Sequence, residues 1–102
     1  WIDTDPAITA GNGEVDDAFA LVQALRSPEL EIAGVSAVYG NSGIDHTFAM
    51  AREIVARADC ADIPVYRGSR CREDRSANDA TSALTRALND GPLTILALGP
   101  LT

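Results

Sequence analysis

Apolar and polar residues follow each other along this chain in blocks that predict strands and helices in turn. Short, nearly continuous apolar runs are typical of strands that are covered on both faces of a sheet. Longer stretches with an apolar residue every three to four positions are typical of helices with one buried face. The pattern predicts strands at 1–4, 31–39, 63–66 and 93–98, and helices at 14–26, 44–58 and 77–89.

Each predicted helix carries one apolar stripe that we expect to face a sheet. The stripes consist of Val15, Ala18, Phe19, Val22 and Leu25, of Ile44, Phe48, Ala51, Val55 and Ala58, and of Ala80, Ala83, Leu84, Ala87 and Leu88. Ser42 and Asp45 have the spacing of a capping box at the start of the second helix.

Strict alternation of strands and helices with short connections predicts an α/β fold, with an open parallel sheet and helices on both faces. We expect a Rossmann-like strand order of 3-2-1-4 and a single α/β unit over residues 1–102. Pro64 lacks a backbone donor, which suits a strand at the sheet edge. Ligands of such sheets bind beyond the carboxyl ends of the strands, where the strand order reverses.

Four carboxylates gather around the first predicted strand and helix, and they carry the candidate chemistry. Asp3 and Asp5 end the strand, and Asp16 and Asp17 begin the helix. At about 5 Å and an effective dielectric of about 20, each like-charge pair costs roughly 3 kcal/mol. A bound cation or a retained proton relieves that cost, and Ca²⁺ or Mg²⁺ suits oxygen ligands. A single acid in the first turn could be there simply because the helix dipole stabilises it. Four acids together favour a cation site.

Composition narrows the classes of function. The chain has 102 residues, 46% of them hydrophobic, and a net charge of −7 with eight basic residues. This balance argues against nucleic acid as a partner and against anionic membrane surfaces. Cys60 and Cys71 are too far apart for a metal or redox motif. We expect reduced thiols in a cytoplasmic protein, or a disulfide if the protein is exported.

Two further features have plain interpretations. His46 is the only histidine, and no second His or Cys lies at ligand spacing, so we expect a packed or solvated side chain. The segment 67–75 holds four arginines that could grip an anion, but Glu73 and Asp74 dilute their charge. We therefore expect a solvated loop there.

Three sequence blocks together resemble the inosine–uridine-type nucleoside hydrolases. Asp3-Thr4-Asp5-Pro6 with Val15-Asp16-Asp17-Ala18 resembles the family's Asp-rich N-terminal signature. Residues 34–41, ending in Gly-Asn, are similar to its second-strand motif, and residues 96–102 are similar to a later strand-end motif. The blocks stand in the family's order and span the whole chain.

The resemblance implies Ca²⁺-dependent hydrolysis of the N-glycosidic bond of ribonucleosides, giving free base and ribose. It implies that Asp5 is the general base and a metal ligand, and that Asp17 and the backbone carbonyl of Leu98 are further ligands. Asp16 and Asn41 would bind ribose hydroxyls. Asp3 would be a supporting carboxylate. The implied partner is a small nucleoside, and a homo-oligomer stays open.

Two departures from the family pattern stand out. Residues 7–14 form a longer loop than the family's short turn, and residues 67–82 lack its His-Gly-x-Asp-Gly stretch. The final metal ligand and the leaving-group residues would lie beyond Thr102. We therefore expect residues 1–102 to be the N-terminal portion of a longer domain, inactive alone.

Two alternatives stay open at this stage. A haloacid-dehalogenase-like Mg²⁺ phosphatase would use Asp3 as nucleophile and Asp5 as acid and base, but it leaves Asp16, Asp17 and Asn41 unexplained. A non-catalytic module that binds ribose or nucleoside is the other.

Overall fold

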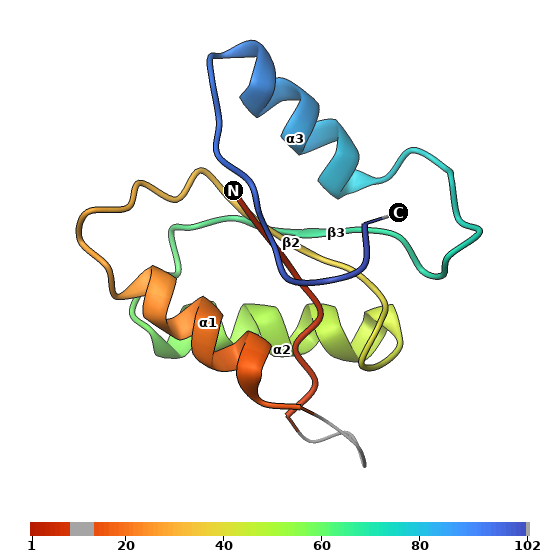
Figure 1. Ribbon diagram of the computed structural model, residues 1–102, viewed down its shortest axis with the longest axis horizontal. Helices are drawn as coiled ribbons and strands as arrows, with labels where there is room; N and C mark the ends of the chain where they lie inside the picture. Colours follow the sequence, from red (N-terminus) through yellow and green to blue (C-terminus); the bar gives the residue numbers. More distant parts are fainter. Residues whose placement is uncertain (9–13, 102) are drawn as a thin grey trace.

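A computed structural model describes residues 1–8 and 14–101 of the chain. Its elements are β1 (Ile2–Thr4), α1 (Asp16–Leu25), β2 (Val35–Ala37), α2 (Ile44–Arg57), β3 (Val65–Arg67), α3 (Asp79–Asn89) and β4 (Leu96–Ala97). The described strands form a parallel sheet in the order β3-β2-β1-β4 (Figure 1). The predicted fold class and strand order are confirmed.

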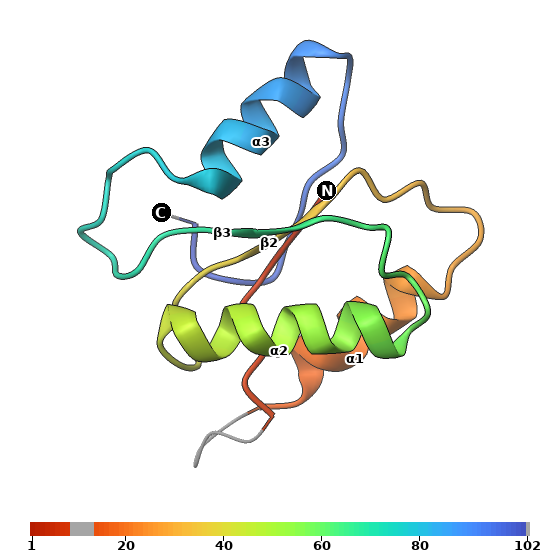
Figure 2. The same ribbon diagram turned by 180° about the vertical axis from the view of Figure 1, so that it is seen from behind.

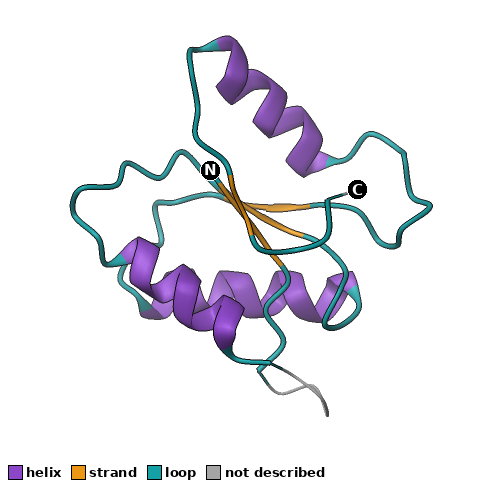
Figure 3. Cartoon of the chain, in the orientation of Figure 1, coloured by secondary structure: helices purple, strands orange, loops and turns teal. Residues whose placement is uncertain are grey.

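The helices cover both faces of the sheet, as the connections require. The right-handed steps from β1 to β2 and from β2 to β3 run in one direction, so α1 and α2 share one face. The step from β3 to β4 returns across the sheet and leaves α3 on the other face. Figure 2 shows the same arrangement from behind, and Figure 3 shows the strands as a thin layer between the helices.

The strand register brings the polar strand ends to one rim of the sheet. β1 lies between β2 and β4, with Asp3 opposite Ser36 of β2 and Ala97 of β4. Because all three strands are parallel, the segments that follow them leave the sheet on the same side. Asp5, Asn41 and Gly99 lie on these segments, so residues far apart in sequence are available to one site.

The core lies between the sheet and the α1–α2 layer. Ile2 of β1 and Val35 of β2 are buried against both helices. The buried helix residues of this cluster are Ala18, Leu21, Ala24, Ile54 and Val55. Truncating one Leu-sized side chain in such a core typically costs about 2–5 kcal/mol. Packing against α1 and α2 therefore stabilises the sheet that carries the rim.

The predicted inner face of α1 is partly wrong. Phe19 is 69% exposed and Val22 is 40% exposed, whereas Leu21 is fully buried. Val15 is exposed as well, at 46%, whereas Ala18 is buried as predicted. The other buried positions are Asp17, Leu21 and Ala24, a helical i, i+4, i+7 stripe. A single rotation of the helix cannot bury both stripes. The observed one joins the core and also turns Asp17 toward the chain that follows β1.

The strands are shorter than predicted. β2 was predicted at 31–39, but its ladder covers Val35–Ala37, because Ile2 pairs with Val35 and residues 31–33 have no partner in β1. β4 was predicted at 93–98 and covers Leu96–Ala97, two residues that are exposed at the sheet edge. β3 lies at the other edge, as expected, but it covers Val65–Arg67 and not the predicted 63–66, so Pro64 directly precedes it.

Helix capping also differs from the prediction. The N-cap of α2 is Gly43, with no side-chain cap hydrogen bond, so the predicted capping box is wrong. Asp45 instead forms a salt bridge with Arg67 of β3. A capping box does occur at α3, where Asn78 accepts a hydrogen bond from the backbone N–H of Thr81 and the Thr81 hydroxyl accepts one from the backbone N–H of Asn78.

Candidate functional site

Asp5 is the central side chain of the rim. The chain leaves β1 after Thr4, and Asp5 is only 5% exposed. Its Oδ2 accepts a 2.7 Å hydrogen bond from the backbone N–H of Asn41, which follows β2. Hydrogen bonds to a carboxylate are stronger than neutral ones. The bond therefore ties the end of β1 to the end of β2 and fixes one oxygen of the carboxylate.

Asp17 meets Asp5 from the first turn of α1. Its side chain is buried, and it shares a carboxyl–carboxyl hydrogen bond with Asp5. The side-chain nitrogen of Asn41 lies 3.5 Å from Oδ2 of Asp17. Asp16, the preceding residue, is exposed. Three of the predicted site residues, Asp5, Asp17 and Asn41, thus contact one another.

Burial and the contact with Asp5 change the protonation of Asp17. Burial raises the pKa of the Asp17 carboxyl from 3.8 to about 7, and the hydrogen bond and charge of Asp5, with the charge of Asp16, act in the same direction. No salt bridge among the described residues reaches Asp5 or Asp17. Asp17 therefore keeps its proton up to a pH of about 7, unless a cation nearby favours its charged form.

A pH prediction follows from this raised pKa. When a chelator has removed divalent cations, the protein is expected to lose stability as the pH rises from about 4 to about 7. The reason is that Asp17 holds its proton more tightly in the folded protein than in the unfolded chain. The contribution is complete below the unfolded pKa of 3.8 and is lost as the pH passes about 7. Thermal denaturation across this range should show a flatter dependence for Asp17→Asn. Equal slopes for both proteins would contradict the assignment.

Asp3 lies near Asp5, but its side chain contacts β2. Its Oδ1 accepts a hydrogen bond from the hydroxyl of Ser36 on β2. The indole N–H of Trp1 donates to the same hydroxyl at 2.9 Å. Burial raises the pKa of the Asp3 carboxyl, the Ser36 hydrogen bond lowers it, and the charge of Asp5 raises it. Asp3 is thus held by Ser36, which is itself held by Trp1, and neither of these two residues was predicted from the sequence to belong to the rim.

The end of β4 is attached to the same place. The backbone N–H groups of Leu98 and Gly99 donate to the carbonyl of Asp3, at 2.7 Å and 3.2 Å. This pairing brings the segment after Leu98 to the side of the Asp5 carboxylate that faces away from Asn41. Leu98, whose backbone carbonyl is a predicted metal ligand, directly precedes this segment.

The other features singled out in the sequence lie apart from this contact. Arg67 pairs with Asp45 and lies over the ring of Phe48, and Arg70 pairs with Asp74. Cys60 and Cys71 are free thiols. Within residues 1–8 and 14–101, no helix is both long and apolar enough to cross a membrane. The longer loop expected at 7–14 falls largely on residues 9–13, which lie outside the described residues.

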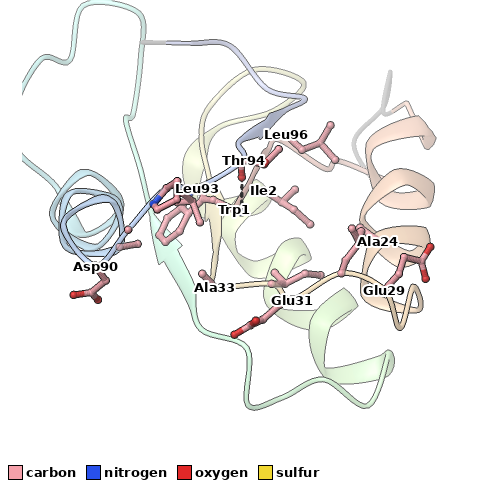
Figure 4. A pocket seen from close by; sticks show the side chains of 15 residues that line it. Trp1, Ile2, Ala24, Glu29, Glu31, Ala33, Asp90, Leu93, Thr94 and Leu96 are labelled. Atoms are coloured by element: carbon pink, nitrogen blue, oxygen red, sulfur yellow. Dashed lines mark hydrogen bonds between the residues drawn. The ribbon is translucent and has the colours of Figure 1, made fainter.

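A cavity of about 480 Å³ lies at the opposite end of the strands (Figure 4). Trp1, Ala33 and Asp90 belong to its lining, and the N-terminal amino group of Trp1 donates to the carbonyl of Thr94 there. None of the predicted site residues lines it. The candidate site is therefore the rim, as the position of ligands in parallel sheets predicts.

The rim has oxygen donors suited to a hard cation, but the set is incomplete. Among the described residues, no group of three His, Cys, Asp or Glu side chains is placed to hold a metal. Asp5 and Asp17 supply two carboxylates in direct contact. Ca²⁺ takes six to eight oxygens. The two carboxylates alone therefore supply fewer oxygens than a Ca²⁺ ion takes.

The chain is similar to several known nucleosidases and nucleoside hydrolases. Uridine nucleosidase 1 of Arabidopsis thaliana is 30% identical over 130 residues, covering 99% of this chain and 37% of that protein. The non-specific ribonucleoside hydrolase RihC of Klebsiella pneumoniae (strain 342) is 29% identical over 129 residues, covering 99% of this chain and 40% of that protein. A solved plant nucleoside hydrolase, the PpNRh1 enzyme, superposes with a TM-score of 0.83 at 30% identity, covering 99% of this chain and 39% of that one.

The extent of these matches fixes what they mean. The matched regions span between 18% and 59% of the curated relatives' own length. Both long alignments exceed the 102 residues of this chain, so those relatives carry positions that have no counterpart here. The family model described as inosine-uridine preferring nucleoside hydrolase matches residues 1–102. This chain therefore belongs to the family of inosine-uridine preferring nucleoside hydrolases.

Proposed function

We propose that the protein hydrolyses the N-glycosidic bond of ribonucleosides, with Ca²⁺ as cofactor, and releases free base and ribose. Membership of the family supports the class of reaction. The observation that carries the proposal is the contact between the buried carboxylates of Asp5 and Asp17 beside Asn41. The chain would supply this part of the site to a longer domain, in line with its share of the relatives' length.

Asp5, Asp17 and the backbone carbonyl of Leu98 are the proposed ligands of the ion. The fit rests on charge, because burial and the negative charge of Asp5 raise the pKa of the Asp17 carboxyl to about 7, and a bound cation would favour its charged form instead. The chemistry that Ca²⁺ supplies when bound is a fixed positive charge that orients oxygen ligands and favours a deprotonated water. Residues outside this chain would complete the coordination.

Asp5 is the proposed general base. The hydrogen bond from the backbone of Asn41 fixes its Oδ2, so the carboxylate is held in place for proton transfer. Asp5 would take a proton from water while the water oxygen bonds to C1′ of the ribose. The bond from C1′ to the base nitrogen breaks, and its electron pair leaves with the base. Protonation of the leaving base would fall to a group beyond Thr102.

Asp16 and Asn41 are the proposed ribose-binding residues. Asp16 is exposed in the first turn of α1, beside Asp17, where a substrate can reach it. A carboxylate there binds sugar hydroxyls and stabilises the positive charge that develops on the ring as the glycosidic bond breaks. Asp3, which is held by Ser36, is the proposed supporting carboxylate. Its charge would add to the negative potential of the rim.

The family match favours this hypothesis over the phosphatase alternative, since the matched family covers Asp16, Asp17 and Asn41 as well as Asp3 and Asp5. The test is an assay of the purified full-length protein on several ribonucleosides, with Ca²⁺ and with a chelator. Free base and ribose should appear in equal amounts and only with Ca²⁺. Binding without turnover would favour the non-catalytic alternative, and phosphate release from phosphorylated substrates would favour the phosphatase.

Replacing Asn41 by alanine is expected mainly to raise KM. Alanine keeps the backbone N–H that holds Oδ2 of Asp5, so kcat should stay close to that of the wild type. The variant loses a side-chain hydrogen bond to the sugar, about 0.5–1.5 kcal/mol. Steady-state kinetics should therefore show a several-fold rise in KM. A fall in kcat at unchanged KM would move Asn41 from ribose binding to the chemical step.

A further inference from the structure

Gly40 lies directly against the carboxylate of Asp5. A Cβ atom added at Gly40 would lie 1.8 Å from Oδ2 of Asp5 and 2.8 Å from its Cγ. Carbon atoms in favourable contact lie about 3.5–4.0 Å from a neighbour. Only a residue without a Cβ can therefore occupy this position while Asp5 keeps its place.

Gly99 approaches the other oxygen of the same carboxylate. A Cβ atom added there would lie 3.3 Å from Oδ1 of Asp5 and 2.7 Å from a methyl carbon of Val38. The two glycines follow β2 and β4, the two neighbours of β1 in the sheet. The carboxylate thus lies in a cradle between Gly40 and Gly99.

Backbone hydrogen bonds hold both sides of the cradle in place. The N–H of Gly40 donates to the carbonyl of Ser42 at 3.0 Å, and the next N–H, of Asn41, donates to Oδ2 of Asp5. The N–H of Gly99 donates to the carbonyl of Asp3 at 3.2 Å. Neither segment can withdraw without losing these bonds, so a collision would displace the carboxylate instead.

We propose that Gly40 and Gly99 are positioning residues that set the orientation of the Asp5 carboxylate for the reaction. Their bare backbones let the ends of β2 and β4 close on the two oxygens of Asp5. The Asn41 N–H then fixes the torsion of the side chain. This inference rests on the proposed role of Asp5 as general base, and it assigns the precision of that base to two residues that never touch the substrate.

Replacing Gly40 by alanine tests the proposal. The added methyl group must push Oδ2 away by more than 1 Å to reach even a tight contact of 3.0 Å. A displacement of about 1 Å in a catalytic site can cost about 100-fold in rate. We therefore expect kcat of the full-length protein to fall about 100-fold, with a smaller change in KM. The carboxylate is the movable end of a side chain, so the fold should persist.

Two other glycines provide matched controls. Gly43 has nothing within 4 Å of an added Cβ, so Gly43→Ala should leave kcat unchanged. Gly91 also has open space but shares a positive φ, +149° against +158° at Gly40. Gly91→Ala thus measures the cost of backbone strain in the melting temperature without a collision. A kcat loss shared by Gly91→Ala would overturn the proposal.

A double-mutant cycle separates positioning from a general structural role. In the Asp5→Ala background no carboxylate remains to be displaced. Adding Gly40→Ala there should not lower kcat further. It should lower the melting temperature only by the backbone strain seen in Gly91→Ala and by the 3.0 Å contact of the new Cβ with Cδ of Pro100. Independent effects that add in both backgrounds would overturn the cradle.

The cycle also distinguishes this inference from the proposed function. If the wild type hydrolyses no ribonucleoside, the proposed function fails. The melting temperatures of the four proteins in the cycle still show whether Gly40 and Asp5 are coupled. If the wild type is active and the two changes are additive in kcat, the cradle fails and the function stands.

Discussion

Asp5→Asn is expected to lower kcat by about 10²–10⁴-fold, the usual contribution of a positioned general base. Asparagine keeps the size of the side chain and one oxygen that can accept the hydrogen bond from Asn41. It removes the ability to accept a proton from water. Substrate binding depends on other groups, so KM should change much less than kcat.

Steady-state kinetics on several ribonucleosides at saturating Ca²⁺ is the measurement for this substitution. Asp90→Asn is the control, because Asp90 is an exposed carboxylate that caps α3 and lines the cavity at the opposite end of the strands. Its kcat should equal that of the wild type. Near-normal turnover by Asp5→Asn would place the base on another residue.

The fold was predictable because its signal is repeated along the whole chain. Alternating strand and helix patterns with short connections leave few topologies. The buried face of α1 was not predictable in detail, because Phe19 and Leu21 are both apolar but lie on different faces of the helix. Tertiary packing decides between them, since Leu21 packs into the core with Ile2 and Val35. The strand bounds depend likewise on the register of neighbouring strands.

The site was predictable only where side-chain type carries the chemistry. Carboxylates placed densely at a strand end and a helix start repel one another, and this cost is visible in the sequence. Asp5 and Asp17 could therefore be paired before the structure was known. The backbone N–H of Asn41 and the space left by Gly40 have no such signal, since every residue but proline has that donor. A Gly-Asn pair directly after a buried strand was the one available cue. Its meaning required the distance to Asp5.

Asp17→Ala is expected to lower the Ca²⁺ affinity of the full-length protein by about 100-fold or more. Residues that only orient a metal ligand cost about 10–100-fold when they are lost, and Asp17 is proposed as a direct ligand. The metal-free variant should behave in the opposite way at neutral pH. Removing Asp17 also removes its repulsion with Asp5, so the apoprotein should not lose stability.

These opposite signs make the test selective. Ca²⁺ stabilises a protein that binds it only when folded. Saturating Ca²⁺ should therefore raise the melting temperature of the wild type and of Asp79→Ala, a first-turn helix acid of α3 that is exposed. It should leave that of Asp17→Ala almost unchanged. Calorimetric titration of the chelated proteins measures the affinities directly. Equal heats for wild type and Asp17→Ala would show that the carboxylate pair does not bind the ion.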